Sequence, residues 1–180
     1  GLAFLCSNRM SKQHVRHLDY GSLTLGYVQG SSGPSEDLNA VLSNMEVKVS
    51  WVSNIKVSIW EKLVWNVPFN PLSVIYGGVT TDVLVNDADI CKRVRCIMEE
   101  VCLAAKADGV DLPDSIVDEK IAATQQMAPY QTSMCLDFLA GLPLETEAIV
   151  GNLVRFCNKN KVPIPYISNC LSTLLDKKKD

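Results

Sequence analysis

The segment WEKLVWNVPFNPL, residues 60–72, places a stripe of polar side chains inside an otherwise apolar run. The stripe consists of Lys62, Asn66 and Asn70, each four residues from the next. On a helix this spacing aligns the three side chains along one narrow face. A lysine and two amides are costly to bury unless a polar partner meets them. The segment therefore predicts a helix whose polar face meets a ligand with a carbonyl, a hydroxyl or a carboxylate.

An ammonium beside two amides suits the reduction of a carbonyl group. Hydride addition to a ketone forms an alkoxide, which a nearby ammonium can stabilise and protonate. A free lysine has a pKa of about 10.4, and partial burial of Lys62 would bring this pKa nearer to neutral. The alternative is a helix-surface lysine that pairs with Glu61 or Asp82.

The segment resembles the catalytic helix of the ketopantoate reductase (2-dehydropantoate 2-reductase) family, whose pattern runs W-x-K-x-x-x-N-x-x-x-N-P-L. A second block also matches the family in order and spacing, and it consists of Ser133-Met134, Asp137, Glu145 and Gly151. The resemblance extends over essentially all 180 residues, but it covers only the later part of the family's chain.

The resemblance implies a role for each polar residue of the two blocks. Lys62 matches the general acid, and Asn66, Asn70 and Ser133 match the residues that bind the substrate. Each of the last three has a structural alternative. Asn66 could be a helix-packing amide, Asn70 could cap a helix that begins at Pro71, and Ser133 could cap the helix that follows it.

The resemblance also implies NADPH (NADP+) as the cofactor. Glu145 matches a family glutamate near the cofactor ribose and the catalytic lysine, although it also suits the first turn of a helix. Ser7 falls where the family's backbone touches the cofactor. The choice of NADPH over NADH comes from the resemblance alone. The implied reaction reduces 2-dehydropantoate to (R)-pantoate, a step toward pantothenate and coenzyme A.

No G-x-G-x-x-G turn, the usual pyrophosphate-binding fingerprint, occurs in the sequence. We therefore expect the chain to be a fragment or a truncated product that lacks most of its cofactor domain, and to show no turnover by itself. Two other functions stay open. One is a non-catalytic helical module for interaction or dimerisation, and the other is a related 2-keto acid dehydrogenase.

The pattern of apolar residues changes near residue 58. Residues 1–58 read as mostly β, with strands at 2–6 and 47–51, a hairpin of 15–18 and 22–27, and a helix at 36–45. The resemblance makes this part the last strands and helix of a Rossmann-type nucleotide-binding domain. It makes residues 59–180 an all-α substrate-binding domain of the 6-phosphogluconate dehydrogenase C-terminal-like type.

The helical part is predicted to begin with residues 59–76, which form one long helix or two helices with a kink at Pro68. Further helices are expected at 87–107, 133–139 and 145–158. The helix at 87–107 has an apolar face with a repeat near 3.6 residues, which consists of Ile90, Val94, Ile97, Val101 and Ala105.

Composition excludes several classes of partner. The net charge of -3 disfavours a nucleic-acid partner, and no apolar run reaches the roughly 18 residues of a membrane span. The seven cysteines include no C-x-x-C pair, and the chain has two histidines, so we expect no metal site. We expect reduced thiols in a cytoplasmic protein that binds a small-molecule substrate, with a homodimer as a candidate assembly.

Overall fold

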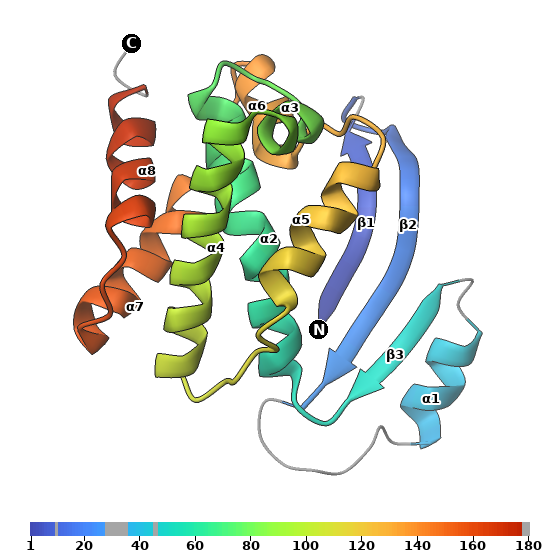
Figure 1. Cartoon of the computed structure of the whole chain (residues 1–180). Coiled ribbons are helices and arrows are strands. Elements are labelled where there is room, and N and C mark those ends of the chain that lie inside the picture. Colours follow the sequence, from blue (N-terminus) through green and yellow to red (C-terminus); the bar gives the residue numbers. More distant parts are fainter. Residues whose placement is uncertain (10, 28–35, 45–46, 178–180) are drawn as a thin grey trace. The chain divides into compact units, whose positions relative to one another are not determined.

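The computed structural model describes residues 1–9, 11–27, 36–44 and 47–177, and it divides the chain into two compact units, Gly1–Ile59 and Trp60–Asp180. The first unit holds a small sheet and one short helix, and the second is helical (Figure 1). The chain is thus mostly helical with a small sheet. The predicted change from β to helical structure occurs where the pattern of apolar residues changes.

The sheet of the first unit has the order β1-β2-β3. Strand β1 (Leu2–Arg9) pairs antiparallel with β2 (Val15–Gly26), and β2 pairs parallel with β3 (Lys48–Val52). A parallel pair needs a crossover connection, and helix α1 (Glu36–Ser43) lies on the segment that joins β2 to β3. The unit therefore contains one strand–helix–strand crossover, an arrangement typical of α/β domains.

The predicted hairpin of 15–18 and 22–27 is wrong, because residues 15–26 form the single strand β2. Gly21 has a φ of 149°, which favours glycine. The register of β1 shifts at this point, since Phe4 lies opposite Ser22 but Leu5 lies opposite Tyr20. Gly21 is therefore the extra residue of a β-bulge, which disturbs the pairing without reversing the chain.

Helix α2 (Ile55–Ile75) runs without interruption through both of its prolines, Pro68 and Pro71. Neither proline has a backbone N–H, so the carbonyls four residues earlier, at Val64 and Val67, lose their helical partners. The sequence left open one helix or two, and the structure has one. Asn70 therefore lies inside the helix, which excludes its alternative role as an N-cap.

The helical unit is organised around α4 (Ala88–Ala107). Helices α3 (Thr81–Asn86) and α5 (Ile116–Gln126) pack against each other and against α4, while α7 (Asn152–Asn160) and α8 (Pro165–Asp176) pack against α4 from the other side (Figure 1). The largest side chains that are almost fully buried belong to this unit and are Phe69, Leu72, Leu84, Ile97, Met98, Met134, Ile167 and Leu174.

A helix was predicted at 145–158. The structure has a π-helical turn, η1 (Glu147–Gly151), followed by α7. Before it lies the short helix α6 (Ser133–Leu139), with the bounds that the sequence predicted. Single π-helical turns inside helices often occur at functional sites, and η1 begins two residues after Glu145.

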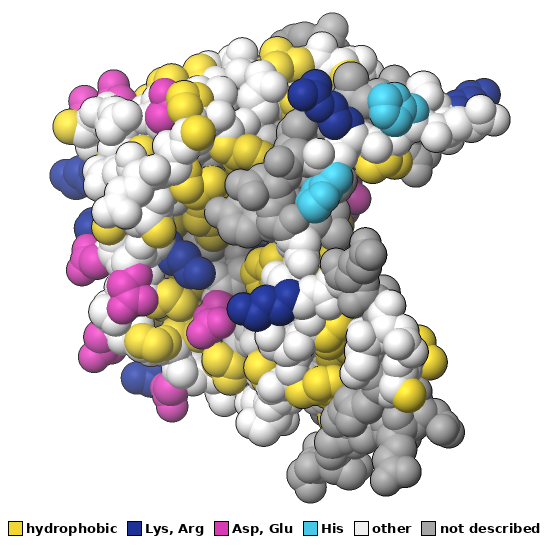
Figure 2. All heavy atoms as spheres, turned by 90° about the vertical axis from the view of Figure 1, so that its right-hand side faces the viewer, with side chains coloured by type: hydrophobic (Ala, Val, Ile, Leu, Met, Phe, Trp, Pro, Cys, Tyr) yellow, Lys and Arg dark blue, Asp and Glu magenta, His cyan; other side chains and the backbone are white. Residues whose placement is uncertain are grey.

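Among the helices that the structure describes, none has the length and apolar character needed to cross a bilayer. On the left of the face drawn in Figure 2, acidic and basic side chains lie among one another and among apolar side chains. That part of the face offers no extended basic surface for a phosphate backbone.

Candidate active site

Lys62 lies on α2 and is half-buried. Burial disfavours a charged ammonium, and this desolvation lowers the pKa of Lys62 from the ordinary value of 10.5. A lower pKa lets the ammonium give up its proton more readily, which suits a general acid that works nearer to neutral pH.

The polar stripe becomes progressively more buried along α2. Lys62 and Asn66 are half-buried, whereas Asn70 is 3% exposed. The side-chain amide of Asn70 donates from Nδ2 to the Asn66 carbonyl oxygen at 3.0 Å. An amide nitrogen carries two hydrogens, so this bond leaves one hydrogen of Asn70 for another acceptor.

The start of α6 lies next to Asn70. Asn70 Oδ1 accepts from the backbone N–H of Met134 at 3.4 Å and lies 3.5 Å from Ser133 Oγ, which donates to it. Asn70 and Ser133 are 63 residues apart in sequence, so the fold brings the two sequence blocks together. The Ser133 side of this contact reaches the surface, because Ser133 is exposed.

Thr132, not Ser133, caps α6. The Thr132 side chain accepts from the backbone N–H of Cys135 at 3.1 Å, and Ser133 is the first residue of the helix. The alternative interpretation of Ser133 as an N-cap is therefore wrong, and its hydroxyl is not used for capping.

Two buried hydroxyls lie near this contact, and the sequence pattern did not predict a role for them. Ser73 Oγ lies 2.9 Å from Thr132 Oγ1, and both residues are almost fully buried. The only signals in the sequence are that Ser73 follows Asn70 by three residues on an apolar helix, and that Thr132 precedes Ser133.

The two residues predicted at the cofactor lie in different units. Glu145 is exposed, and its backbone carbonyl accepts from the N–H of Ile149 in η1 at 3.1 Å. Ser7 lies in β1 of the first unit, opposite His17 of β2. Their roles toward a cofactor stay predictions.

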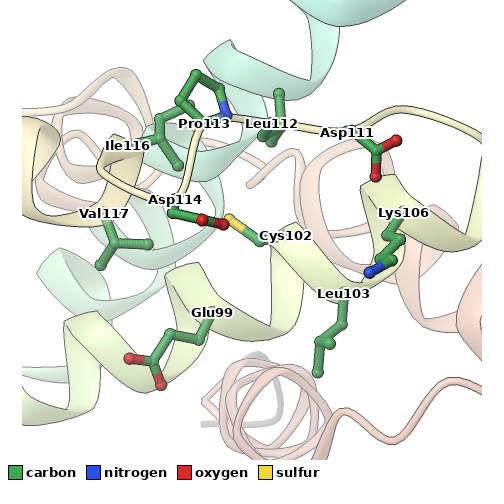
Figure 3. Close-up of a pocket in the computed structure, with 10 residues that line it drawn as sticks. All are labelled: Glu99, Cys102, Leu103, Lys106, Asp111, Leu112, Pro113, Asp114, Ile116 and Val117. Carbon is green, nitrogen blue, oxygen red and sulfur yellow. The ribbon is translucent and has the colours of Figure 1, made fainter.

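A pocket of about 340 Å³ also lies in the helical unit, but none of the predicted site residues lines it. It is formed by α4, by the segment that leads into α5 and by the first residues of α5 (Figure 3). Cys102 lies in its wall, and burial raises the pKa of this thiol. A protonated thiol is a poor nucleophile, so the chemistry favours the stripe on α2 over this pocket.

Within the described residues, no group of three or more His, Cys, Asp and Glu side chains could hold a metal ion. The α2 stripe supplies an ammonium and two amides, and Ser133 at the start of α6 supplies a hydroxyl. Groups of these types are able to bind a small oxygen-rich anion and to donate a proton.

A family model described as ketopantoate reductase PanE/ApbA C terminal matches residues 54–178. The chain belongs to the ketopantoate reductase family. The match covers the helical unit and the start of α2, so the resemblance inferred from the two sequence blocks is confirmed.

Relatives and solved structures agree with this family. The 2-dehydropantoate 2-reductase of Nostoc sp. is 38% identical over 177 residues, which are 95% of this chain and 55% of the relative. The crystal structure of 2-dehydropantoate 2-reductase from Methylococcus capsulatus is 38% identical, with a TM-score of 0.86, over 98% of this chain and 57% of that one. The structure from Geobacter metallireducens GS-15 is 32% identical, with a TM-score of 0.90, over 98% and 59%.

The chain spans about half the length of the curated relatives that it matches, at 55%, 48% and 50% for three of them.

Proposed function

We propose that this chain supplies the substrate-binding and proton-donating part of a 2-dehydropantoate 2-reductase, which reduces 2-dehydropantoate to (R)-pantoate with NADPH. The observation that carries the proposal is the polar stripe Lys62, Asn66 and Asn70 on α2, whose buried end is hydrogen-bonded to the start of α6 at Ser133. The family match and the similarity to 2-dehydropantoate 2-reductases support the choice of substrate.

Lys62 acts as the general acid in this proposal. As a hydride adds to the keto carbon, the carbon–oxygen π bond breaks and the oxygen takes a proton from Lys62 Nζ, which becomes a neutral amine. The lowered pKa of Lys62 favours this transfer, because it weakens the hold of the amine on its proton.

Asn66, Asn70 and Ser133 hold the substrate. Ser133 is exposed, and the single hydrogen of its hydroxyl can turn from the long 3.5 Å contact with Asn70 Oδ1 to a substrate carboxylate. Asn70 has an amide hydrogen beyond the one given to Asn66. Hydrogen bonds to a charged group are about twice as strong as those between neutral groups. A keto acid is therefore bound through its carboxylate and hydroxyl while its carbonyl faces Lys62.

NADPH, when bound, supplies the hydride. The residues of this chain assigned to it are Glu145 and Ser7. An exposed carboxylate such as that of Glu145 is an acceptor for ribose hydroxyls, and the backbone of β1 at Ser7 offers further polar groups. These donor and acceptor types fit the cofactor.

We further propose that residues 1–58 are the C-terminal part of a Rossmann-like domain and that residues 59–180 are a domain of the 6-phosphogluconate dehydrogenase C-terminal-like type. The parallel pair β2–β3 with α1 in its crossover supports the first assignment. The helical unit around α4 supports the second. A cytoplasmic location and a homodimer stay predictions.

The test uses the protein at the length in which its own cells make it. Oxidation of NADPH is followed with 2-dehydropantoate as the substrate, for the wild type and for Lys62→Met. Loss of a general acid lowers kcat by a factor of about 100 to 10,000. The matched control is Lys92→Met, which removes an exposed lysine of α4 and should leave kcat unchanged.

Other outcomes point to the other functions. Preferred turnover of a different 2-keto acid would identify a related dehydrogenase. If the wild-type protein fails to oxidise NADPH in the presence of any 2-keto acid tested, the proposed reaction is rejected in favour of a non-catalytic helical module.

A further inference from the structure

A run of buried polar groups joins α2 to α6 behind the proposed substrate contacts. Asn70, Ser73 and Thr132 are 3%, 0% and 1% exposed. A buried hydroxyl without a hydrogen bond costs free energy, so each of these side chains should have partners, and each does.

The hydrogen bonds have one direction. Ser73 Oγ donates its single hydrogen to the Asn70 carbonyl oxygen at 2.8 Å. In its 2.9 Å contact with Thr132 Oγ1, Ser73 must therefore accept, and Thr132 must donate. Thr132 Oγ1 in turn accepts from the N–H of Cys135 at 3.1 Å. The chain of donors thus runs from the α6 backbone through Thr132 and Ser73 to the α2 backbone.

These bonds are shorter than the direct contacts of the Asn70 side chain with α6. The chain through the two hydroxyls has distances of 2.8, 2.9 and 3.1 Å. The contacts from Asn70 Oδ1 to Met134 N and Ser133 Oγ are 3.4 and 3.5 Å, at the weak end of the hydrogen-bond range. The two hydroxyls, rather than the Asn70 amide, therefore hold α6 in place against α2.

We propose that Ser73 and Thr132 are positioning residues that set the spacing between Asn70 and Ser133. The proposal rests on the proposed function, because it assumes that the spacing between Asn70 and Ser133 matters for binding the substrate. Neither hydroxyl touches the substrate. Hydrogen-bonded chains of this kind strengthen one another in a buried setting, so loss of one member loosens the whole connection.

The first variant is Thr132→Val in the native-length protein, which removes the hydroxyl and keeps the shape of the side chain. We expect the KM for 2-dehydropantoate to rise about five- to tenfold, as for the loss of one to two hydrogen bonds. The KM for NADPH should not change. Thr132→Ser, which restores the hydroxyl, should restore the KM, and Ser73→Ala should raise it as Thr132→Val does.

The matched control is Thr124→Val. Thr124 is also a buried threonine, at 1% exposed, and its hydroxyl accepts from Trp65 Nε1 at 3.1 Å and donates to the Lys120 carbonyl at 2.7 Å. This change should lower the Tm without changing the KM for the keto acid. If Thr132→Val lowers the Tm and leaves that KM unchanged, as the control does, the proposal is overturned.

A second measurement tests the positioning role of Thr132 and Ser73 independently of the proposed enzymatic function. Amide resonances of Met134 and of the Asn70 side chain report on the contact between α2 and α6. Thr132→Val should shift them, and Thr124→Val should not. Unshifted resonances overturn the positioning role whatever the substrate is, whereas shifted resonances in a protein that does not turn over 2-dehydropantoate reject only the proposed function.

Discussion

The half-buried ammonium of Lys62 has a consequence for the pH dependence of the proposed reaction. A general acid must carry its proton, so kcat should be level at low pH and fall about tenfold per pH unit above the pKa of Lys62. Burial lowers this pKa from 10.5, so the fall should begin below the pH at which an ordinary lysine loses its proton. The measurement is kcat at saturating substrate from about pH 6 to about pH 10.

Lys62→Arg provides the comparison for this profile. A guanidinium stays protonated throughout the range, so the variant should be slower but should lose the alkaline decline. An identical decline in the variant would assign the titration to another group and contradict the role of Lys62.

Among single side chains, the stripe on α2 could be predicted because its members lie on one helix at a fixed spacing. Ser73 and Thr132 could not, because their contact joins positions 59 residues apart. A serine or threonine has the same local signature whether it caps a helix, packs against one or joins two. Thr132 and Ser133 are adjacent hydroxyl residues, and only the fold decides which of them caps α6.

Helix α8 depends on a side chain from another helix. Its N-cap residue, Ile164, has no side chain that can cap. Glu100 of α4 supplies the acceptors instead, since its two carboxylate oxygens accept from the backbone N–H groups of Tyr166 and Ile167 at 2.8 Å each. We expect Glu100→Ala to destabilise the protein by about 1 to 3 kcal/mol, because it leaves two N–H groups without partners. Glu99→Ala, at the exposed neighbouring position, is the control for urea unfolding.

The same carboxylate gives a pH dependence with a defined sign. Desolvation raises the pKa of Glu100, although the two backbone N–H groups oppose this rise. Between the unfolded pKa of about 4.3 and the raised native pKa, the folded protein binds more protons, so this contribution to stability is lost as pH rises. The advantage of the wild type over Glu100→Ala should therefore be largest below the unfolded pKa. An advantage that grows with pH would contradict this assignment.

Helices could be predicted from local sequence signals. The predictions failed where the structure depends on contacts between distant residues. The repeat of Val94, Ile97 and Val101 predicted the buried face of α4, and all three are fully buried. Asp87 caps the same helix through its side chain. By contrast, a glycine such as Gly21 is typical of a hairpin turn. Only the pairing of β2 with β1 shows that Gly21 is the extra residue of a β-bulge. The cap that Glu100 gives to α8 spans 66 residues, so no local pattern could have predicted it.

For the molecule as a whole, the proposed proton donor and substrate-binding residues belong to one part of the chain. The proton donor and the substrate contacts all lie in the helical unit Trp60–Asp180, which the family match of residues 54–178 covers. The sequence contains no glycine-rich turn of the type that binds a pyrophosphate. Binding of the keto acid and tight binding of the dinucleotide should therefore be separable properties.

A polypeptide of residues 1–180 alone should consequently give no detectable oxidation of NADPH with 2-dehydropantoate. Its helical unit should still bind the keto acid, because the carboxylate contacts assigned to Ser133 and Asn70 need no cofactor. The measurement combines an assay of NADPH absorbance with amide shifts of Ser133 and Met134 during a titration with 2-dehydropantoate. The Ser133→Ala variant should lose those shifts. Steady NADPH oxidation that Lys62→Met abolishes would contradict the prediction, since it would mean that residues 1–180 suffice to bind both reactants.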